Sequence, residues 1–498
     1  MNKTLKGIIG GGALLGVLGG VLAVLKLTEK KPEQDSSSSE AETIMLWHAE
    51  SDDINQITVE PADGEKYTAV RKIEQTETTD LNGSIVTQDI ANYYLTGYED
   101  IPMNTVSIRL LATRSPELAA VAVVQENASD EDLARFGLDH PVHVTLQADG
   151  QEQPISFFIG DKTQVESCYY LRMDGEKTVY TVTESAMEPY LRSVKDYLGT
   201  ELIAEQAEDD ETVVESVRIS RKDLDYDIFL EYDDGVSQSD RSGGLARHIM
   251  TEPIQCMLSP DKSSDATHGL YGLTASEVVT PHPTESQIQE CGFDDPFACV
   301  TVKTDDGKTS VFKLANTYET EEGGKYYYGM LEGINCIYGF SADATVYDDV
   351  RAEDISSKNV VSLYVWDVSH MKCKAGNQVL EFRGEGTDQS DYKLTLNGES
   401  YGDNERYRQL YAFLLETKAE DLVIEEIEPT GEPLAEIQVE RNDGGRSYDI
   451  QYYTAGTQKA YISVNGRISF RCRKSYVDTL IHNMEIFEDS AQPIKTTW

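Results

Sequence analysis

The chain has 498 residues, which at roughly 100–200 residues per domain predicts about two to four domains. Lys and Arg total 43, Asp and Glu total 88, and the formal net charge is −45. Hydrophobic residues make up 39 % of the chain, enough for sizeable cores, so wholesale disorder is excluded. No nucleic-acid partner is expected, because nucleic-acid binding depends on Lys and Arg that displace counterions.

The N-terminus predicts a membrane anchor. Residues 7–25 carry no charge, and at about 1.5 Å per residue a helix over them would span roughly 28 Å. Lys3 and Lys6 precede this stretch, and no clear small-x-small cleavage site follows it. Residues 1–31 are therefore predicted as a cytoplasmic tail and transmembrane signal anchor, with the bulk of the chain outside the cell membrane. The serine-rich residues 32–43 are predicted as a flexible linker.

Three glycines recur at every fourth position of this anchor: Gly12, Gly16 and Gly20. They would share one face of a helix, and such a face lets a second membrane helix approach closely. The alternative is that these glycines reflect only the general frequency of glycine in membrane helices.

Two stretches of the chain resemble each other, at residues 136–180 and 291–338. Each contains a Gly-x-Asp-x-Pro signature, then an Asp-Gly pair, then neighbouring tyrosines and a further strand-like segment that contains a tyrosine. Self-similarity of this kind indicates repeated structural units. The signature residues are Gly137, Asp139, Pro141, Gly292, Asp294 and Pro296.

Local patterns predict the same elements in both units. Residues 129–132 and 284–287 have the pattern of capping boxes that open short helices. Gly137 and Gly292 then stand where a helix ends in a left-handed residue. Alternating apolar residues and Asp-Gly turns predict a four-strand meander after each signature. In the first unit, apolar residues at helical spacing over 187–198 predict one closing helix.

A third, degenerate unit is predicted between residues 434 and 486, where strands, turns and a final helix follow in the same order but the signature is missing. The fold class is therefore α+β, with tandem modules of antiparallel meanders and flanking helices in an elongated chain behind the transmembrane helix. The predicted modules cover residues 44–200, 201–355 and 356–498. Such boundaries carry an error of a few residues.

The two signature aspartates, Asp139 and Asp294, have two interpretations. Paired carboxylates could serve as an acid and a base. A residue found in each repeated unit is better explained as a loop cap that accepts backbone N–H groups before the proline. We therefore expect a structural role for the signature residues.

Other sequence matches to catalytic or metal motifs are weak. Ser259 and Lys262 form a Ser-x-x-Lys pattern, and residues 308–310 loosely resemble a Lys-Thr-Gly strand, but the region around residue 260 is predicted as loop. His140 and His143 straddle a proline before a strand and should point to opposite faces. Asp-Gly pairs predict hairpin turns rather than calcium loops, with weak adventitious divalent binding as the alternative. These pairs begin at Asp149, Asp174, Asp234 and Asp306.

No catalytic residue, metal site or cofactor is therefore predicted. The seven cysteines contain no Cys-x-x-Cys pair and are interpreted mostly as small buried residues, with a single Cys291–Cys299 bridge as the alternative. The 28 tyrosines are interpreted as half-buried strand residues, with a carbohydrate- or peptide-binding platform as the alternative. Residues 225–244 end in a polar loop.

At these motifs the sequence resembles a bacterial family, the domain-of-unknown-function family 4340. Residues 136–141 (FGLDHP), 159–161 (IGD), 169–170 (YY) and 179–180 (VY) carry the resemblance, and the second unit departs from it at residues 314–316. It covers most of residues 45–350 and more weakly the remainder. The resemblance implies a membrane-anchored extracytoplasmic protein, auxiliary to an ABC-type transporter, and supplies no catalytic residues.

Three functions follow as hypotheses. The first is an accessory or scaffold protein of a membrane complex, acting by protein–protein contact. The second is a module that binds cell wall or glycans through tyrosine-lined sheet faces. The third is a hydrolase whose site is assembled from distant carboxylates in a concave pocket.

Overall fold

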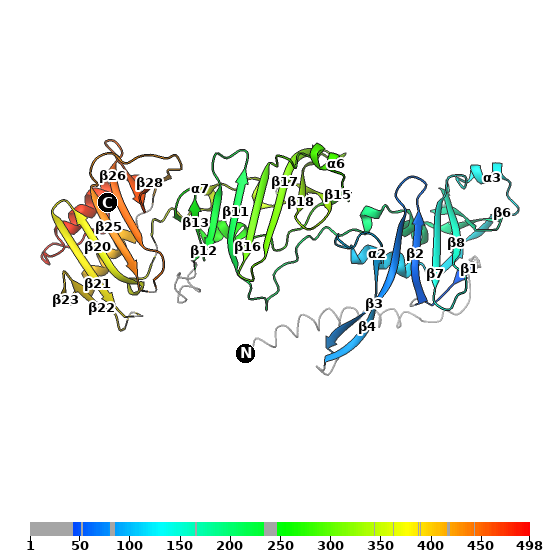
Figure 1. The fold of residues 1–498 in the computed structure, drawn as a ribbon, viewed down its shortest axis with the longest axis horizontal. Helices are drawn as coiled ribbons and strands as arrows, with labels where there is room; N and C mark the ends of the chain where they lie inside the picture. The colour runs from blue at the N-terminus through cyan, green and yellow to red at the C-terminus, as the bar shows by residue number, and fades with distance from the viewer. Residues whose placement is uncertain are drawn as a thin grey trace, which may run out of the picture.

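The computed structural model describes residues 43–50, 53–79, 85–164, 167–233, 247–342, 344–361, 363–386, 388, 390–415, 419–442 and 444–498. Three large antiparallel sheets follow one another along the long axis of the molecule (Figure 1). We call the parts that carry them modules 1, 2 and 3, over residues 44–197, 214–355 and 365–485. The predicted α+β class is confirmed in its coarse form, because the described residues form mostly antiparallel strands with few helices.

Module 1 has an eight-stranded sheet of order β4-β3-β2-β7-β8-β9-β10-β6, beside a two-stranded sheet of β1 and β5. Its elements are β1 (Ile44–His48), β2 (Ile54–Glu60), β3 (Tyr67–Thr79), β4 (Ile85–Leu95), α2 (Thr105–Arg114), β5 (Glu117–Ala120), β6 (Ala122–Gln125), α3 (Asp130–Arg135), β7 (Val142–Ala148), β8 (Ile155–Lys162), β9 (Cys168–Met173), β10 (Val179–Thr183), α4 (Glu184–Leu191) and the 3₁₀ helix η2 (Val194–Tyr197).

Module 2 has a nine-stranded sheet of order β14-β13-β12-β11-β16-β17-β18-β19-β15. Its elements are β11 (Val214–Arg221), β12 (Ile228–Tyr232), β13 (His248–Glu252), β14 (Cys256–Met257), α5 (Pro260–Thr267), β15 (Glu277–Pro281), α6 (Glu285–Glu290), β16 (Ala298–Thr304), β17 (Thr309–Glu319), β18 (Lys325–Leu331), β19 (Cys336–Ser341), η4 (Val346–Asp348) and α7 (Ala352–Ile355).

Module 3 has a nine-stranded sheet of order β23-β22-β21-β20-β25-β26-β27-β28-β24. Its elements are η5 (Val365–Asp367), β20 (Val368–Ala375), β21 (Gln378–Glu385), β22 (Lys393–Leu396), β23 (Glu399–Tyr401), α8 (Asn404–Leu415), β24 (Asp421–Leu422), β25 (Ala435–Arg441), β26 (Tyr448–Thr454), β27 (Lys459–Val464), β28 (Arg467–Arg473) and α9 (Lys474–Glu485).

All three sheets have the same strand order. In each sheet, a first meander leads from the middle of the sheet to one edge. The first strand of this meander pairs with the first strand of a second, four-strand meander. The last strand of that second meander pairs with a short strand that precedes it in the chain. The two halves of each sheet thus join through residues 62–94 positions apart, which no local pattern specifies. Modules 2 and 3 carry one more strand than module 1, because β14 and β23 extend their first meanders.

The apolar alternation of the strands places the core on one face of each sheet. Val144 and Leu146 of β7 are fully buried, and Phe157 and Ile159 of β8 are fully buried as well. Burial of every second residue is what a strand with one face in the core requires. Helix α4 packs against β7, β9 and β10, and α9 packs against β20, β21, β27 and β28. This burial is the main stabilising term of each module.

One helix prediction and one loop prediction are wrong. The closing helix of the first unit stops at Leu191, and η2 follows after a break at Arg192 and Ser193. The Asp196 carboxylate accepts the Ser193 N–H at 2.8 Å, so a new helical turn is capped at this point. The region predicted as loop after Ser259 is helix α5. Its Pro260 stands in the first turn, where the lost N–H costs nothing.

Two junctions connect the modules. Between modules 1 and 2, His282 Nε2 lies 2.9 Å from Asp100 Oδ1, and the His282 ring stacks on Tyr98 at 4.9 Å. Between modules 2 and 3, Asp233 lies 3.7 Å from Arg441 and 3.8 Å from Arg446. The side chains of Asp233 and Arg441 are 8 % and 1 % exposed, so this second pair is buried.

The predicted transmembrane segment, residues 7–25, and its glycines Gly12, Gly16 and Gly20 lie outside the described residues, as do residues 32–42 of the predicted linker. Within the part of the chain that the structure describes, no helix is long and apolar enough to cross a membrane.

Candidate functional site

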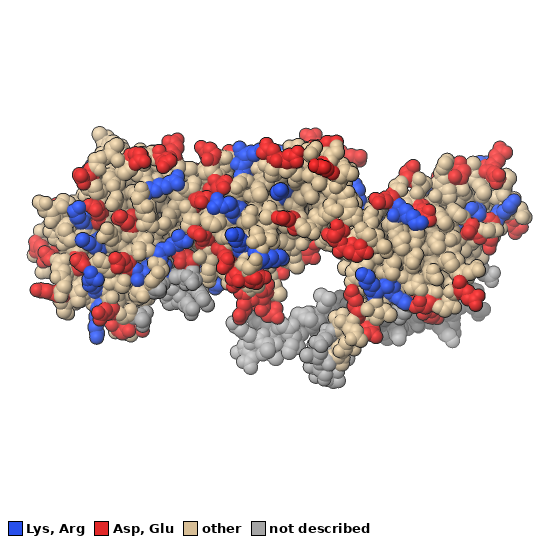
Figure 2. Space-filling model, in the orientation of Figure 1, with Lys and Arg blue, Asp and Glu red and all other residues tan. Residues whose placement is uncertain are grey.

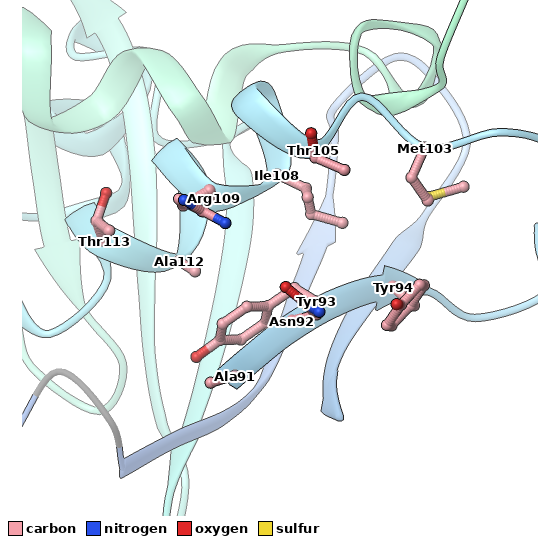
Figure 3. A pocket seen from close by; sticks show the side chains of 10 residues that line it. All are labelled: Ala91, Asn92, Tyr93, Tyr94, Met103, Thr105, Ile108, Arg109, Ala112 and Thr113. Atoms are coloured by element: carbon pink, nitrogen blue, oxygen red, sulfur yellow. The ribbon is translucent and has the colours of Figure 1, made fainter. Parts of the chain in front are cut away.

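A groove lies in module 1 between strand β4 and helix α2 (Figure 3). Its volume is about 360 Å³. Residues 91–94 of β4 form one wall, and Met103 lies beside them. The opposite wall is α2, through Thr105, Ile108, Arg109, Ala112 and Thr113.

Strand β4 is the edge of its sheet. It has 11 residues and pairs along its whole length with β3, while no described strand pairs with its other side. The edge strands β14 and β23 of modules 2 and 3 have 2 and 3 residues. Long open edges are uncommon in natural proteins because their backbone groups pair readily with other chains.

Backbone geometry shows which residues of β4 face outward. The Thr96 N–H donates to the Thr68 carbonyl at 2.9 Å, and the ladder then pairs Tyr94 with Val70 and Asn92 with Lys72. Hydrogen-bonded and non-hydrogen-bonded pairs alternate in an antiparallel ladder, so the even-numbered residues bond to β3. The N–H and C=O of Ala91 therefore point away from β3, toward the open side.

Side chains on the face away from α2 fix the β3–β4 hairpin. Asn92 Nδ2 and Tyr94 Oη donate to the two carboxylate oxygens of Glu74, at 2.7 and 2.8 Å. These hydrogen bonds, the one from Asn92 first, lower the pKa of Glu74 and keep it ionised. Lys72 lies over the Tyr94 ring, 4.8 Å from its centroid. The wall of the groove is thus held in register from behind.

Helix α2 is fixed by its cap and its buried face. The Asn104 side chain accepts the Ser107 N–H at 3.0 Å, which caps the first turn. Ile108, Leu111 and Ala112 face the core and are at most 4 % exposed. Ile108 and Ala112 also line the groove, so its floor is apolar.

The groove differs in charge from the rest of the molecule. Asp and Glu are spread over all three modules on the face seen in Figure 2. Arg109 is the sole charged residue among those that line the groove. Its side chain is exposed, and no Asp or Glu is among the residues that line the groove. In a chain of net charge −45, the one charge that lines this groove is therefore positive.

The signature glycines form a second, structural feature. Gly137 and Gly292 have φ of 68° and 89°, the left-handed conformation expected for them. A Cβ on Gly137 would lie 2.4 Å from Asp161 Cγ, and one on Gly292 would lie 2.6 Å from Asn316 Cγ. The Asp161 N–H donates to the Phe136 carbonyl at 2.8 Å. The signature loop of module 1 thus closes on the Asp of the Ile-Gly-Asp motif, and Asn316 takes that place in module 2.

The loop-cap role expected for Asp139 and Asp294 is not formed. Both side chains are exposed, and neither accepts a hydrogen bond from a described residue. The loop is held by backbone bonds and glycine contacts instead. Pro141 and Pro296 are half-buried, Pro141 directly before β7 and Pro296 two residues before β16. The two aspartates lie in different modules, on separate sheets, so the structure does not bring them together as an acid–base pair.

The weak catalytic and metal matches gain no support. Lys262 is exposed on α5, while Ser259 is the residue before that helix. His143 stacks on Phe158 at 4.7 Å and His140 is exposed. Among the described residues, no group of three or more His, Cys, Asp or Glu is placed to hold a metal ion.

Neither the cysteines nor the tyrosines form a site. All seven cysteines are free and five are buried, so the alternative Cys291–Cys299 bridge is not formed. Cys291 ends α6, whereas Cys299 lies within β16. All 28 tyrosines are described, and none is exposed, which agrees with their interpretation as strand and core residues.

The Asp-Gly pairs at Asp149, Asp174 and Asp306 form turns, with left-handed glycines after each aspartate. Asp234 lies outside the described residues, as do residues 235–244 of the polar loop.

Sequence reasoning missed the groove. The long β3–β4 hairpin had a signal, since Asn82-Gly83 between two alternating segments is typical of a hairpin turn. The approach of α2 had none, because it depends on tertiary packing.

These features define the chain as a three-module antiparallel β protein with an open edge strand in module 1. Residues 93–296 match the model of a family described as "Domain of unknown function (DUF4340)". The chain thus resembles this family over a stretch that contains both signatures and most of the groove, and the predicted resemblance is confirmed. No curated protein and no solved structure matches the chain.

Proposed function

We propose that this chain is a membrane-anchored, extracytoplasmic accessory or scaffold protein that acts by protein–protein contact through the β4–α2 groove. The open edge of β4 carries the proposal. It is an 11-residue strand with no described neighbour on one side, and it stands against a helix. Edges of this kind bind other polypeptides.

Exposed apolar side chains at the groove support the same function. Ile73 of β3 is 63 % exposed and lies opposite Ala91 in the ladder, on the same face of the hairpin. Val106 of α2 is 78 % exposed and stands one turn before Arg109. Large apolar side chains exposed beside a groove favour a partner that covers them.

The location and the partner are part of the proposal. The uncharged residues 7–25, with Gly12, Gly16 and Gly20 on one helical face, support an anchor that contacts another membrane helix. The family resemblance supports a role beside an ABC-type transporter. We propose no catalytic activity, cofactor or metal.

The test is capture of the full-length chain from its native membrane in mild detergent, followed by mass spectrometry. Thr113→Trp would fill the groove, whereas Arg114→Trp places the same side chain on the neighbouring exposed position outside it. We expect membrane-complex subunits to be captured by the wild type and by Arg114→Trp, and to be reduced about tenfold by Thr113→Trp.

Equal capture by both tryptophan variants would overturn the groove as the contact surface. A parallel variant with Gly12, Gly16 and Gly20 changed to Leu separates the anchor from the groove. If that variant alone loses the subunits, the contact lies in the membrane.

A further inference from the structure

We infer that the groove holds its partner by strand addition: an extended segment of a partner protein pairs with the outer edge of β4, and a carboxylate of that segment contacts Arg109. This inference rests on the proposed function, since it states how the groove would hold a partner and which chemistry it would select.

The chain itself fills the equivalent position in the other modules. In module 2, β14 pairs antiparallel with β13 directly before α5, and in module 3, β23 pairs antiparallel with β22 directly before α8. In module 1, residues 96–104 run from β4 to α2 without forming a strand. The place of the fourth strand is therefore open in module 1 alone, among the residues that the structure describes.

The edge offers the hydrogen-bond groups that an added strand requires. By the alternation of the ladder, the Ala91 N–H and C=O point toward the open side. An antiparallel segment would pair with them as β14 pairs with β13. The groove extends along residues 91–94, a length of about 13 Å at roughly 3.3 Å per residue. It therefore suits a segment of a few extended residues.

The side chains define which segment fits. Successive residues of the added strand would alternate between the two faces of the sheet, and those on the α2 face would meet the buried Ile108 and Ala112. Small or branched apolar residues suit that floor. Arg109 lines the groove with no Asp or Glu among the other lining residues, and a guanidinium binds a carboxylate in a bidentate way. An Asp or Glu side chain and a free C-terminal carboxylate share this chemistry.

The test uses two display libraries of random dodecapeptides as probes, one with free C-termini and one with the random segment placed internally. Peptides selected on the full-length chain are then measured by titration against variants. Ala91→Pro removes the N–H that points to the open side and leaves every hydrogen bond of the β3–β4 ladder in place. Ala91→Ser keeps that N–H and is the control. Arg109→Glu is matched by Arg114→Glu, an equal charge change outside the groove.

We expect Ala91→Pro and Arg109→Glu each to weaken binding by about tenfold, and both matched controls to change it by less than about twofold. Selection from the free C-terminus library alone would assign the carboxylate to the chain end, and selection from both would assign it to Asp or Glu. As a second readout, the wild-type Ala91 amide should become protected from hydrogen exchange when peptide is added, which also serves if Ala91→Pro fails to fold.

Peptide binding could depend on Arg109 and yet show no effect of Ala91→Pro and no protection of the Ala91 amide. That result would overturn strand addition and leave the groove as a protein contact. Peptides insensitive to every groove variant would overturn the groove itself, and with it the proposed function. Concentration-dependent dimerisation that Ala91→Pro abolishes would assign the edge to a second copy of this chain. It would overturn the inference that a different protein supplies the added strand.

Discussion

The two junctions between modules differ in how far their charged side chains are buried. Modules 2 and 3 meet around the buried Asp233 and Arg441, with Arg446 bridging Asp233 and Glu231. Modules 1 and 2 meet through His282 and Asp100, whose side chains are 36 % and 47 % exposed, and through the stack of His282 on Tyr98. Loss of one partner of a buried ion pair lowers the free energy of unfolding strongly, because the other charge stays buried. An exposed pair competes with water and contributes little to that free energy. Loss of the His282–Asp100 contact is therefore expected to cost less than loss of the Asp233–Arg441 pair.

The largest expected effect is at the buried junction. Asp233→Ala removes a buried carboxylate that lies 3.7 Å from the buried Arg441 and should cost about 3–5 kcal/mol of unfolding free energy. Glu231→Ala removes the half-exposed partner of Arg446 and should cost about 1 kcal/mol or less. Hydrogen exchange of the β12 and β25 amides measures both. Equal losses in the two variants would contradict the contrast between the buried and the exposed pair.

The second effect is at the exposed junction. His282→Ala removes the stack on Tyr98 and the contact with Asp100, and should cost about 1 kcal/mol. Exchange of the η2 and β15 amides, which lie at this junction, should accelerate accordingly. His140→Ala, an exposed histidine away from the junction, is the control and should change nothing. A loss at His282 as large as that at Asp233 would contradict the expected ranking of the two contacts.

The third effect depends on pH. The hydrogen bond from His282 lowers the pKa of the Asp100 carboxyl below its usual value. A carboxyl whose pKa is lower in the folded state stabilises the fold above its unfolded pKa, near 4, and this contribution disappears as pH falls through the lowered value. Asp100→Asn should therefore be less stable than wild type by under about 1 kcal/mol at pH 6. Denaturation at pH 6 and at successively lower pH should show the difference shrink as the pH falls from the unfolded pKa through the lowered folded pKa.

The smallest effect concerns salt. At 1 M ionic strength the screening length is about 3 Å, so the exposed His282–Asp100 contact should lose a few tenths of a kcal/mol under conditions where His282 is protonated. The buried Asp233–Arg441 pair should keep its contribution, because ions do not reach it. Repeating the Asp100→Asn and Asp233→Ala measurements in 0.1 and 1 M NaCl, where screening lengths are roughly 10 and 3 Å, tests this. Equal salt dependence at both sites would show that Asp233 is accessible to ions.

Local features of the fold could be predicted, and non-local ones could not. The capping boxes at Ser129 and Thr284 and the left-handed Gly137 and Gly292 depend on neighbours within a few residues, and they stand as expected. The pairing of Ile57 with Leu146 joins strands that the chain separates widely, so no spacing reveals it. Helix α5 was missed because its polar composition resembles a loop, although Pro260 at its start is typical of a helix N-terminus.

The candidate site depended almost wholly on tertiary structure. Arg109 is an ordinary helix residue in the sequence, and what distinguishes it is the lack of acidic neighbours in the folded groove. The signature aspartates drew attention because they recur, yet Asp139 and Asp294 face solvent. Recurrence identified the glycines correctly, since Gly137 leaves no room for a Cβ beside Asp161.

The identical strand order of the three sheets has a consequence for how such a chain diverges. Module 3 keeps that order although it lacks the Gly-x-Asp-x-Pro signature, so the order does not depend on the signature loop. In a protein with several modules of one architecture, one module can change while the other modules keep the shared strand order. Module 1 differs from its siblings at the outer strands, with longer β3 and β4 and no fourth strand. The outer margin of the sheet is thus the place where one module differs while the shared strand order is kept.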